Sequence, residues 1–154
     1  MTKVLIVEDD SFKLDDLRAF VEGSIKQATI TQALDVASAV EELELNVFDL
    51  LIIDMALPSH PVISGGGSPL SLLSGGLELL FELRYMQRND DCIIITQYPE
   101  IEISGRFFPV SSGVAAIREH FGIQIVACLE YSESSNEWKY DLEKLLKKYE
   151  NINS

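Results

Sequence analysis

Short apolar runs separated by mostly polar segments are the main pattern along this chain. The clearest is Leu50–Ile53, which stops abruptly at Asp54 and is followed by Leu57 and Pro58. An apolar run bounded by a turn signal is typical of a strand covered on both faces, as in a parallel sheet. We predict five strands, at about residues 3–7, 28–33, 48–53, 92–96 and 123–129.

The segments between these runs show the three- and four-residue spacing of amphipathic helices. In the first of them, Leu14, Leu17, Phe20 and Val21 form an apolar stripe, and Ser11 can cap its start. Further helical patterns begin near residues 38, 77, 111 and 138. This alternation predicts an α/β fold, a parallel sheet with helices on both faces. We expect the common doubly wound, flavodoxin-like strand order 2-1-3-4-5.

Two segments interrupt the alternation and predict enlarged loops in an otherwise single domain of residues 1–154. Residues 58–76 are rich in Gly, Ser and Pro, which is typical of a loop. Residues 97–109 are a second irregular stretch, apolar enough to fold against the domain. Both follow strand ends on the same rim as Asp54, so we expect a lid, a partner surface or a block there.

The composition limits the classes of binding partner and the cellular compartment that we expect. The chain has 154 residues, of which 25 are acidic and 12 basic, and its formal net charge is −13. Because direct nucleic-acid binding normally needs a basic face, this charge argues against it. No apolar run approaches the roughly 18 residues of a membrane span, and the first residues do not resemble a signal peptide. Cys92 and Cys128 make no disulfide framework, so we expect a protein of the reducing cytoplasm.

Acidic residues end two of the predicted strands. Glu8 and Asp9 follow the first strand, and Asp54 follows the third, its neighbour in the expected order. Carboxylates that lie close together repel unless a proton or cation intervenes. Mg²⁺ is a natural cation here, because it binds a few carboxylates while accepting phosphoryl oxygens. Thr96, which ends the fourth strand, adds a hydroxyl on the same rim. A metal ion, a carboxylate nucleophile and a hydroxyl are together what forming an aspartyl phosphate requires.

Each of these residues also has a purely structural explanation. Glu8 and Asp9 favour the N-terminus of a helix. Asp54 fits a turn-forming residue ahead of Pro58, and Thr96 fits an ordinary strand position. The residue types alone leave both explanations open.

Three segments together resemble the receiver domains of two-component response regulators. They are VLIVEDD, FDLLIIDMALP and IIIT, in this order along the chain. The resemblance implies that Asp54 is the phosphoacceptor of a sensor histidine kinase or phosphotransfer protein. It implies a Mg²⁺ bound by Asp9, Asp54 and the backbone carbonyl of Ala56, with Glu8 acting through water. Thr96 would be the switch hydroxyl that bonds the phosphoryl group.

The resemblance also implies how such a domain works. It is not an enzyme, and it signals by protein–protein contact through the surface near its last two strands and their helix. The partner is a downstream protein, or a second copy in a homodimer.

The sequence departs from the family pattern at the fifth strand. Receiver domains usually carry a lysine there, followed by proline, yet no lysine occurs between Lys26 and Lys139. Glu130 stands about where the cation is expected, so a charge-assisted hydrogen bond of roughly 1.5–3 kcal/mol to the phosphoryl group is missing. Gln97 replaces the small residue that usually follows the threonine.

This departure leaves two main hypotheses. The chain is either a phosphorylated receiver or a pseudo-receiver, an interaction module that keeps the fold and works without phosphorylation. A Mg²⁺-dependent phosphohydrolase is weaker, because Ala56 stands where a second catalytic acid would be needed.

Overall fold

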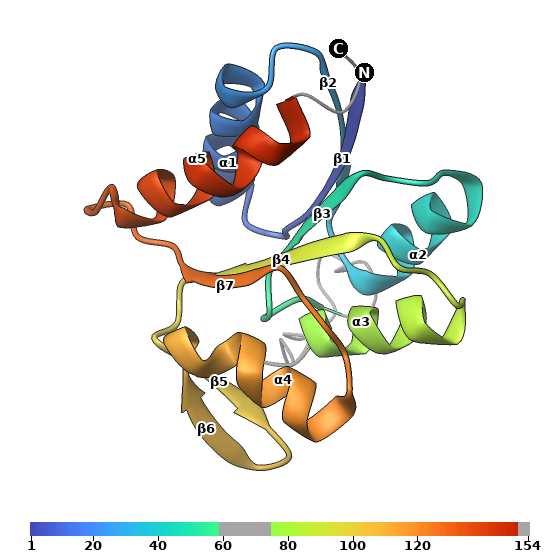
Figure 1. Ribbon diagram of the computed structural model, residues 1–154, viewed down its shortest axis with the longest axis vertical. Coiled ribbons are helices and arrows are strands. Elements are labelled where there is room, and N and C mark those ends of the chain that lie inside the picture. The colour runs from blue at the N-terminus through green and yellow to red at the C-terminus, as the bar shows by residue number, and fades with distance from the viewer. Residues whose placement is uncertain (59–74, 151–154) are drawn as a thin grey trace, which may run out of the picture.

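A sheet of five parallel strands forms the centre of the protein, in the order β2-β1-β3-β4-β7 (Figure 1). The computed structural model describes residues 1–58 and 75–150. Because β7 is the fifth strand of this sheet along the chain, the predicted order 2-1-3-4-5 is confirmed. The strands of the sheet are β1 (Thr2–Val7), β2 (Ala28–Ala33), β3 (Leu50–Ile53), β4 (Asp91–Thr96) and β7 (Ala127–Glu130).

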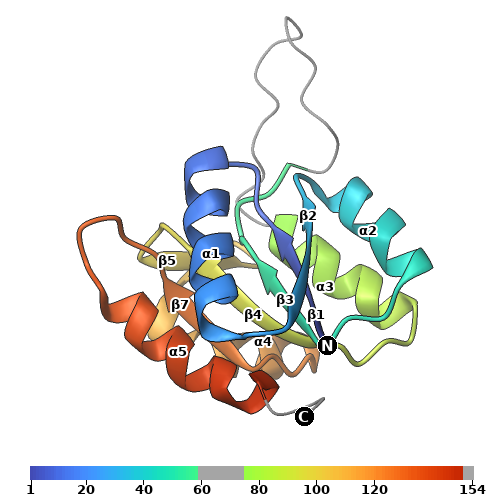
Figure 2. The ribbon, with the colours of Figure 1, turned by 90° about the horizontal axis from the view of Figure 1, so that it is seen from above.

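Helices cover both faces of the sheet, as predicted. Helices α1 and α5 pack on one face, and α2, α3 and α4 pack on the other (Figures 1 and 2). The bounds are α1 (Ser11–Ser24), α2 (Val36–Leu45), α3 (Gly75–Tyr85), α4 (Gly113–Phe121) and α5 (Glu137–Glu150), with a short 3₁₀ turn, η1 (Val110–Ser112), before α4.

The alternation of side chains along the strands builds a core on each face. In β3 all four residues are buried. Leu50 and Ile52 belong to the core under α1 and α5, whereas Leu51 and Ile53 belong to the core under α2, α3 and α4. A strand buried on both faces has no polar positions, which explains the continuous apolar run in the sequence.

The expectation of an irregular stretch at residues 97–109 is wrong. This segment contains an antiparallel hairpin of β5 (Glu100–Ile103) and β6 (Arg106–Pro109), which lies beside α4 (Figure 1). Ile103 pairs with Arg106, so Ser104 and Gly105 form a two-residue turn, and both have positive φ, 53° and 79°. Two positive φ angles are what a tight hairpin turn requires, and a glycine adopts one without strain.

Several predicted boundaries shift by a few residues in the structure, as three examples show. The fifth strand of the sheet begins at Ala127 rather than at Ile123. Helix α1 is capped by Asp10 rather than by Ser11, because the Asp10 carboxylate accepts hydrogen bonds from the first turn. Helix α3 already includes Gly75 and Gly76, ahead of the predicted start at Leu77.

The predicted loop at residues 58–76 falls mainly outside the described residues, since only Pro58, Gly75 and Gly76 of it are described. Within the described ranges, no helix is long and apolar enough to cross a membrane.

Candidate functional site

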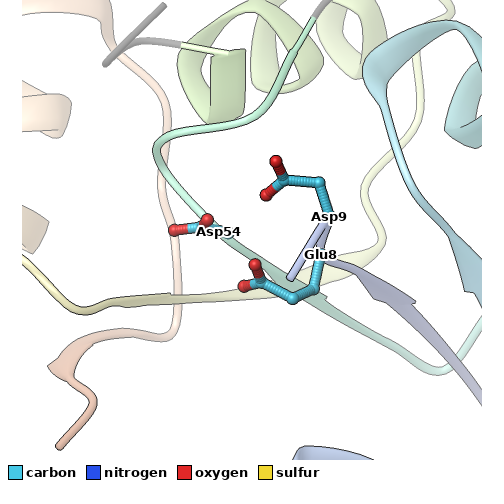
Figure 3. A group of neighbouring side chains, drawn as sticks. All are labelled: Glu8, Asp9 and Asp54. Atoms are coloured by element: carbon cyan, nitrogen blue, oxygen red, sulfur yellow. The ribbon is translucent and has the colours of Figure 1, made fainter. Parts of the chain in front are cut away.

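Three carboxylates meet at the carboxyl edge of the sheet. The backbone N–H of Asp54 donates to the Val7 carbonyl at 3.0 Å, and that of Glu8 donates to the Ala33 carbonyl at 3.0 Å. These bonds continue the strand ladders and hold both residues directly beyond adjacent strands. Carboxylate oxygens of Glu8, Asp9 and Asp54 lie within 4.8 Å of one another (Figure 3). The predicted gathering of the three acids is therefore present.

The turn after β1 places the neighbouring acids Glu8, Asp9 and Asp10 in different surroundings, one buried and two exposed. The Asp10 N–H donates to Glu8 Oε1 at 3.0 Å, and Asp10 Oδ1 accepts from the N–H groups of Phe12 and Lys13 at 2.9 and 3.2 Å. Asp10 is thus the cap of α1. The turn leaves Asp9 exposed while Glu8 and Lys13 point inward and are buried.

Lys13, in the first turn of α1, reaches into the acidic cluster. Its Nζ lies 2.7 Å from Glu8 Oε2 and 3.3 Å from Asp54 Oδ1. It also donates to the Ile95 carbonyl at 3.0 Å and to Gln97 Oε1 at 3.1 Å, at the end of β4. Lys13 is only 2% exposed. A buried lysine is rare unless it is paired, and this one has two carboxylate partners.

Tyr131, directly after β7, completes the surroundings of this lysine. The Lys13 ammonium lies 5.6 Å from the centre of its ring, a cation–π arrangement. The Tyr131 hydroxyl donates to Asp16 Oδ2 at 2.9 Å. Burial raises the pKa of this hydroxyl, and the hydrogen bond to Asp16 raises it further. The hydroxyl therefore stays protonated.

The electrostatics of the cluster favour a bound cation. Burial raises the pKa of the Glu8 carboxyl to about 8, opposed by Lys13 and reinforced by Asp54. Burial and the charge of Asp54 also raise the pKa of Asp9. Among the described residues, Asp54 Oδ2 is buried with no hydrogen-bond partner, and Glu8 Oε2 has only its ion pair with Lys13. Unpartnered carboxylate oxygens beside an exposed acid suit a hard divalent ion such as Mg²⁺.

The other predicted site residues lie on the same edge. Thr96 ends β4 and is buried, and its Oγ1 accepts from the Tyr98 N–H at 3.3 Å. It shares a cavity of about 190 Å³ with Met55, next to the hairpin. The N–H of Ala56 donates to Asp54 Oδ1 at 3.3 Å, which orients the carboxylate. The metal-binding role predicted for the Ala56 carbonyl stays a prediction.

Sequence reasoning found no lysine for this site and so missed Lys13. The Lys13 side chain reaches the site from α1. Glu130, the fifth-strand residue that pairs with Thr96 of β4, is exposed. A signal was present in the sequence, because Lys13, Leu17 and Val21 are spaced four residues apart and begin the buried stripe of α1. The helix dipole also disfavours a lysine in the first turn of a helix. Such a lysine therefore indicates a carboxylate partner nearby.

Comparison with solved structures relates this arrangement to receiver domains. The CheY-like receiver domain from Methanospirillum hungatei aligns over 96% of this chain and 92% of its own, with a TM-score of 0.62 and 19% identity. The response regulator TrrA from Thermotoga maritima, solved in complex with Mg²⁺ and beryllofluoride, aligns over 97% and 99%, with a TM-score of 0.60 and 17% identity. These similarities show the fold.

Sequence comparison decides the family. The Detocs response regulatory protein DtcB of Vibrio alginolyticus is 36% identical over 147 residues, covering 94% of this chain and 99% of DtcB. The chain belongs to the response regulator receiver family. This receiver also resembles the uncharacterised protein y4jS of Sinorhizobium fredii, with 35% identity over 141 residues, but it spans only 30% of that protein's length. No protein-family model matches the receiver.

Proposed function

We propose that residues 1–154 form one receiver domain that is phosphorylated on Asp54 by a histidine kinase or a phosphotransfer protein. The observation that carries the proposal is the free Asp54 Oδ2, a buried carboxylate oxygen with no hydrogen-bond partner among the described residues. Its other oxygen is held by the Ala56 N–H and by Lys13. One oxygen is therefore fixed while the other is left to react.

The transfer step follows from this arrangement. A free Asp54 oxygen attacks the phosphorus of a phosphohistidine, an O–P bond forms and the P–N bond breaks. The electron pair of the broken bond stays on the imidazole nitrogen. Because the second ring nitrogen of the phosphohistidine carries a proton, the group leaves as neutral imidazole. The attacking oxygen belongs to a carboxylate, and the Lys13 ammonium lies 3.3 Å from its other oxygen, Oδ1.

A Mg²⁺ ion fits the donor set of this site. Asp9 and Asp54 would bind it directly, the Ala56 carbonyl would provide a third ligand, and Glu8 would act through water. TrrA, which shares the fold, was solved with Mg²⁺ and beryllofluoride. When bound, such an ion offsets the negative charge that gathers between the carboxylates and the incoming phosphoryl group.

Output would pass through contact with another protein. Thr96 would bond the phosphoryl group, and its hydroxyl already accepts from the Tyr98 N–H, at the start of the link to β5. Tyr98 and Phe107 are exposed apolar side chains beside this link, so the hairpin is a suitable surface for a downstream partner or a second copy. The formal charge of −13 argues against nucleic acid as that partner. The free thiols of Cys92 and Cys128 suit the cytoplasm.

The alternative is a pseudo-receiver that works without phosphorylation. The ion pairs of Lys13 with Glu8 and Asp54 support it, because they already neutralise part of the acidic cluster without any added group. The absence of a fifth-strand lysine supports it as well.

Intact-mass spectrometry after incubation with acetyl phosphate and Mg²⁺ separates these functions. We expect one added phosphoryl group on the wild-type protein and none on Asp54→Asn. An unmodified wild-type protein that also fails to bind Mg²⁺ would favour the pseudo-receiver. An adduct on the Asn variant would contradict the assignment of Asp54.

A further inference from the structure

Lys13 Nζ has more oxygen neighbours than it can bind at once. Glu8, Asp54, Ile95 and Gln97 each present an oxygen within 3.3 Å. An ammonium group has three N–H donors. One of the four contacts is therefore always weaker than the others, and the group can exchange partners by a small rotation.

The four partners differ in how readily they can be given up. Glu8 Oε2 is buried and has no partner besides Lys13 among the described residues, and the Ile95 carbonyl belongs to a buried strand end. Gln97 is neutral and exposed, so water can replace Lys13 as the donor to its side chain. Losing the contact with Gln97 thus leaves no buried polar group unsatisfied.

We propose that Lys13 is the cation that binds the phosphoryl group on Asp54, entering from α1 in place of a fifth-strand lysine. This inference rests on the proposed function of Asp54. On phosphorylation one N–H of Lys13 leaves Gln97 Oε1 and donates to a phosphoryl oxygen, and no proton is transferred. Lys13 keeps its charge and its 2.7 Å contact with Glu8.

The exchange also links the phosphorylation state to the hairpin. Gln97 lies between Thr96, the predicted switch residue, and Tyr98, whose N–H donates to Thr96 Oγ1. In the unphosphorylated protein the hydrogen bond from Lys13 Nζ to Gln97 Oε1 links the Gln97 side chain to α1. Release of Gln97 frees the segment that leads into β5.

The test is a titration with Mg²⁺ followed by a titration with beryllofluoride, a stable mimic of the phosphoryl group. Trp138, the only tryptophan, is a fluorescent reporter, because its ring centre lies 5.0 Å from that of Tyr131 next to Lys13. Wild-type protein is compared with Lys13→Met, and Lys26→Met is the matched control at an exposed lysine. Gln97→Ala tests the exchange of partners.

The proposal predicts opposite effects of Lys13→Met on the two ligands. Beryllofluoride affinity falls roughly ten- to a hundredfold, as expected for the loss of a charged hydrogen bond. Mg²⁺ affinity is unchanged or tightens roughly two- to tenfold, because a positive neighbour has gone. Gln97→Ala improves beryllofluoride affinity by roughly twofold or more, and Lys26→Met matches the wild type.

Three results would overturn the proposal. Equal beryllofluoride affinity in Lys13→Met means that Lys13 does not contact the phosphoryl position. Parallel loss of both ligands means that Lys13 only maintains the structure of the site. If wild-type protein binds Mg²⁺ but not beryllofluoride, the phosphoacceptor function itself fails, and the role of Lys13 fails with it.

A measurement on the wild-type chain covers the case in which Lys13→Met does not fold. Lys13 is buried, whereas every other lysine is exposed or half-buried. In a ¹⁵N-lysine NMR spectrum its ammonium should therefore give the slowest-exchanging signal. We expect that signal to shift when beryllofluoride is added to the Mg²⁺-bound protein. A signal that stays in place contradicts the proposal.

Discussion

The Lys13 ammonium lies 2.7 Å from the Glu8 carboxylate, and both side chains are buried at the carboxyl edge of the sheet. Their attraction offsets the desolvation of two charges, so removing one partner leaves the other charge buried and unpaired. The pair links the start of α1 to the end of β1. The stability of the domain therefore depends on a pair of side chains that belong to the candidate site.

We therefore predict that Lys13→Met lowers the free energy of unfolding by about 3 kcal/mol at pH 8 without Mg²⁺. Glu8→Gln in the same background should recover part of this loss, because the unpaired charge is gone. Denaturant unfolding of the two single variants and the double variant measures the coupling. Strictly additive losses would show that the two side chains do not stabilise each other.

The raised pKa of Glu8 predicts a pH-dependent response to Mg²⁺. Between its ordinary value of 4.5 and about 8, the folded protein holds a proton on Glu8 that the unfolded chain has released. Stability without metal therefore falls as pH rises through this window. Mg²⁺ must displace that proton at low pH, so its affinity should rise by up to about tenfold per pH unit from pH 6 to pH 8.

Melting temperatures with and without Mg²⁺ at pH 6, 7 and 8 test this linkage. We expect the increase on adding Mg²⁺ to be largest at pH 8. Glu8→Gln is the control, and it should flatten the dependence. A metal response that is constant across the range in the wild type would contradict a protonated Glu8.

Gly76 fixes the distance between α3 and the segment that carries Asp54. A Cβ at this position would lie 2.8 Å from the Asp54 carbonyl oxygen and 2.8 Å from Met55 Cα, both backbone atoms. The Gly76 N–H donates to the Met55 carbonyl at 2.8 Å. Gly76→Ala should therefore destabilise the protein by about 1–3 kcal/mol and weaken Mg²⁺ binding.

Gly23→Ala is the matched control for that substitution. Gly23 lies in α1, and an added Cβ would have no atom within 4 Å apart from its chain neighbours and the backbone of its own helix. Its replacement should stabilise the helix by about 0.5–1 kcal/mol and leave Mg²⁺ binding unchanged. If Gly76→Ala behaved like Gly23→Ala, close packing of α3 against the Asp54 segment would be refuted.

The two thiols should be unreactive in the folded protein. Burial raises the pKa of both Cys92 and Cys128 to about 12, so only about one thiol in ten thousand is ionised at pH 8. Iodoacetamide should modify both cysteines rapidly in denaturant and very slowly without it, as measured by intact mass. Rapid native modification of Cys92 would show that the β4 end of the sheet opens readily.

The sequence predicted the strand order because each strand of the sheet is a separate apolar run. Residues 28–33 match β2, and the run at Leu50–Ile53 matches β3. The hairpin of β5 and β6 is absent from the sequence prediction, which treats residues 97–109 as one irregular stretch. The alternation in Glu100–Ile103, followed by Ser104-Gly105, carried the signal of a strand and a tight turn.

The site could be predicted only as far as strand ends determine it. Glu8 and Asp54 follow adjacent parallel strands, so their proximity depends on the strand order alone. Lys13 depends on where α1 crosses the sheet and on a long side chain that folds back beside β4. The family pattern places the lysine in the fifth strand, whereas here the lysine beside Asp54 comes from α1. The sequence pattern of the fifth strand therefore does not reveal it.

The most direct measurement is the location of the phosphoryl group after incubation with acetyl phosphate and Mg²⁺. Reduction with borohydride converts an aspartyl phosphate to homoserine, and peptide mass spectrometry then identifies the modified residue. We predict homoserine at position 54 with Mg²⁺ and no modification when EDTA replaces the metal. Modification at another residue, or an unmodified Asp54 in Mg²⁺-bound protein, would contradict the account.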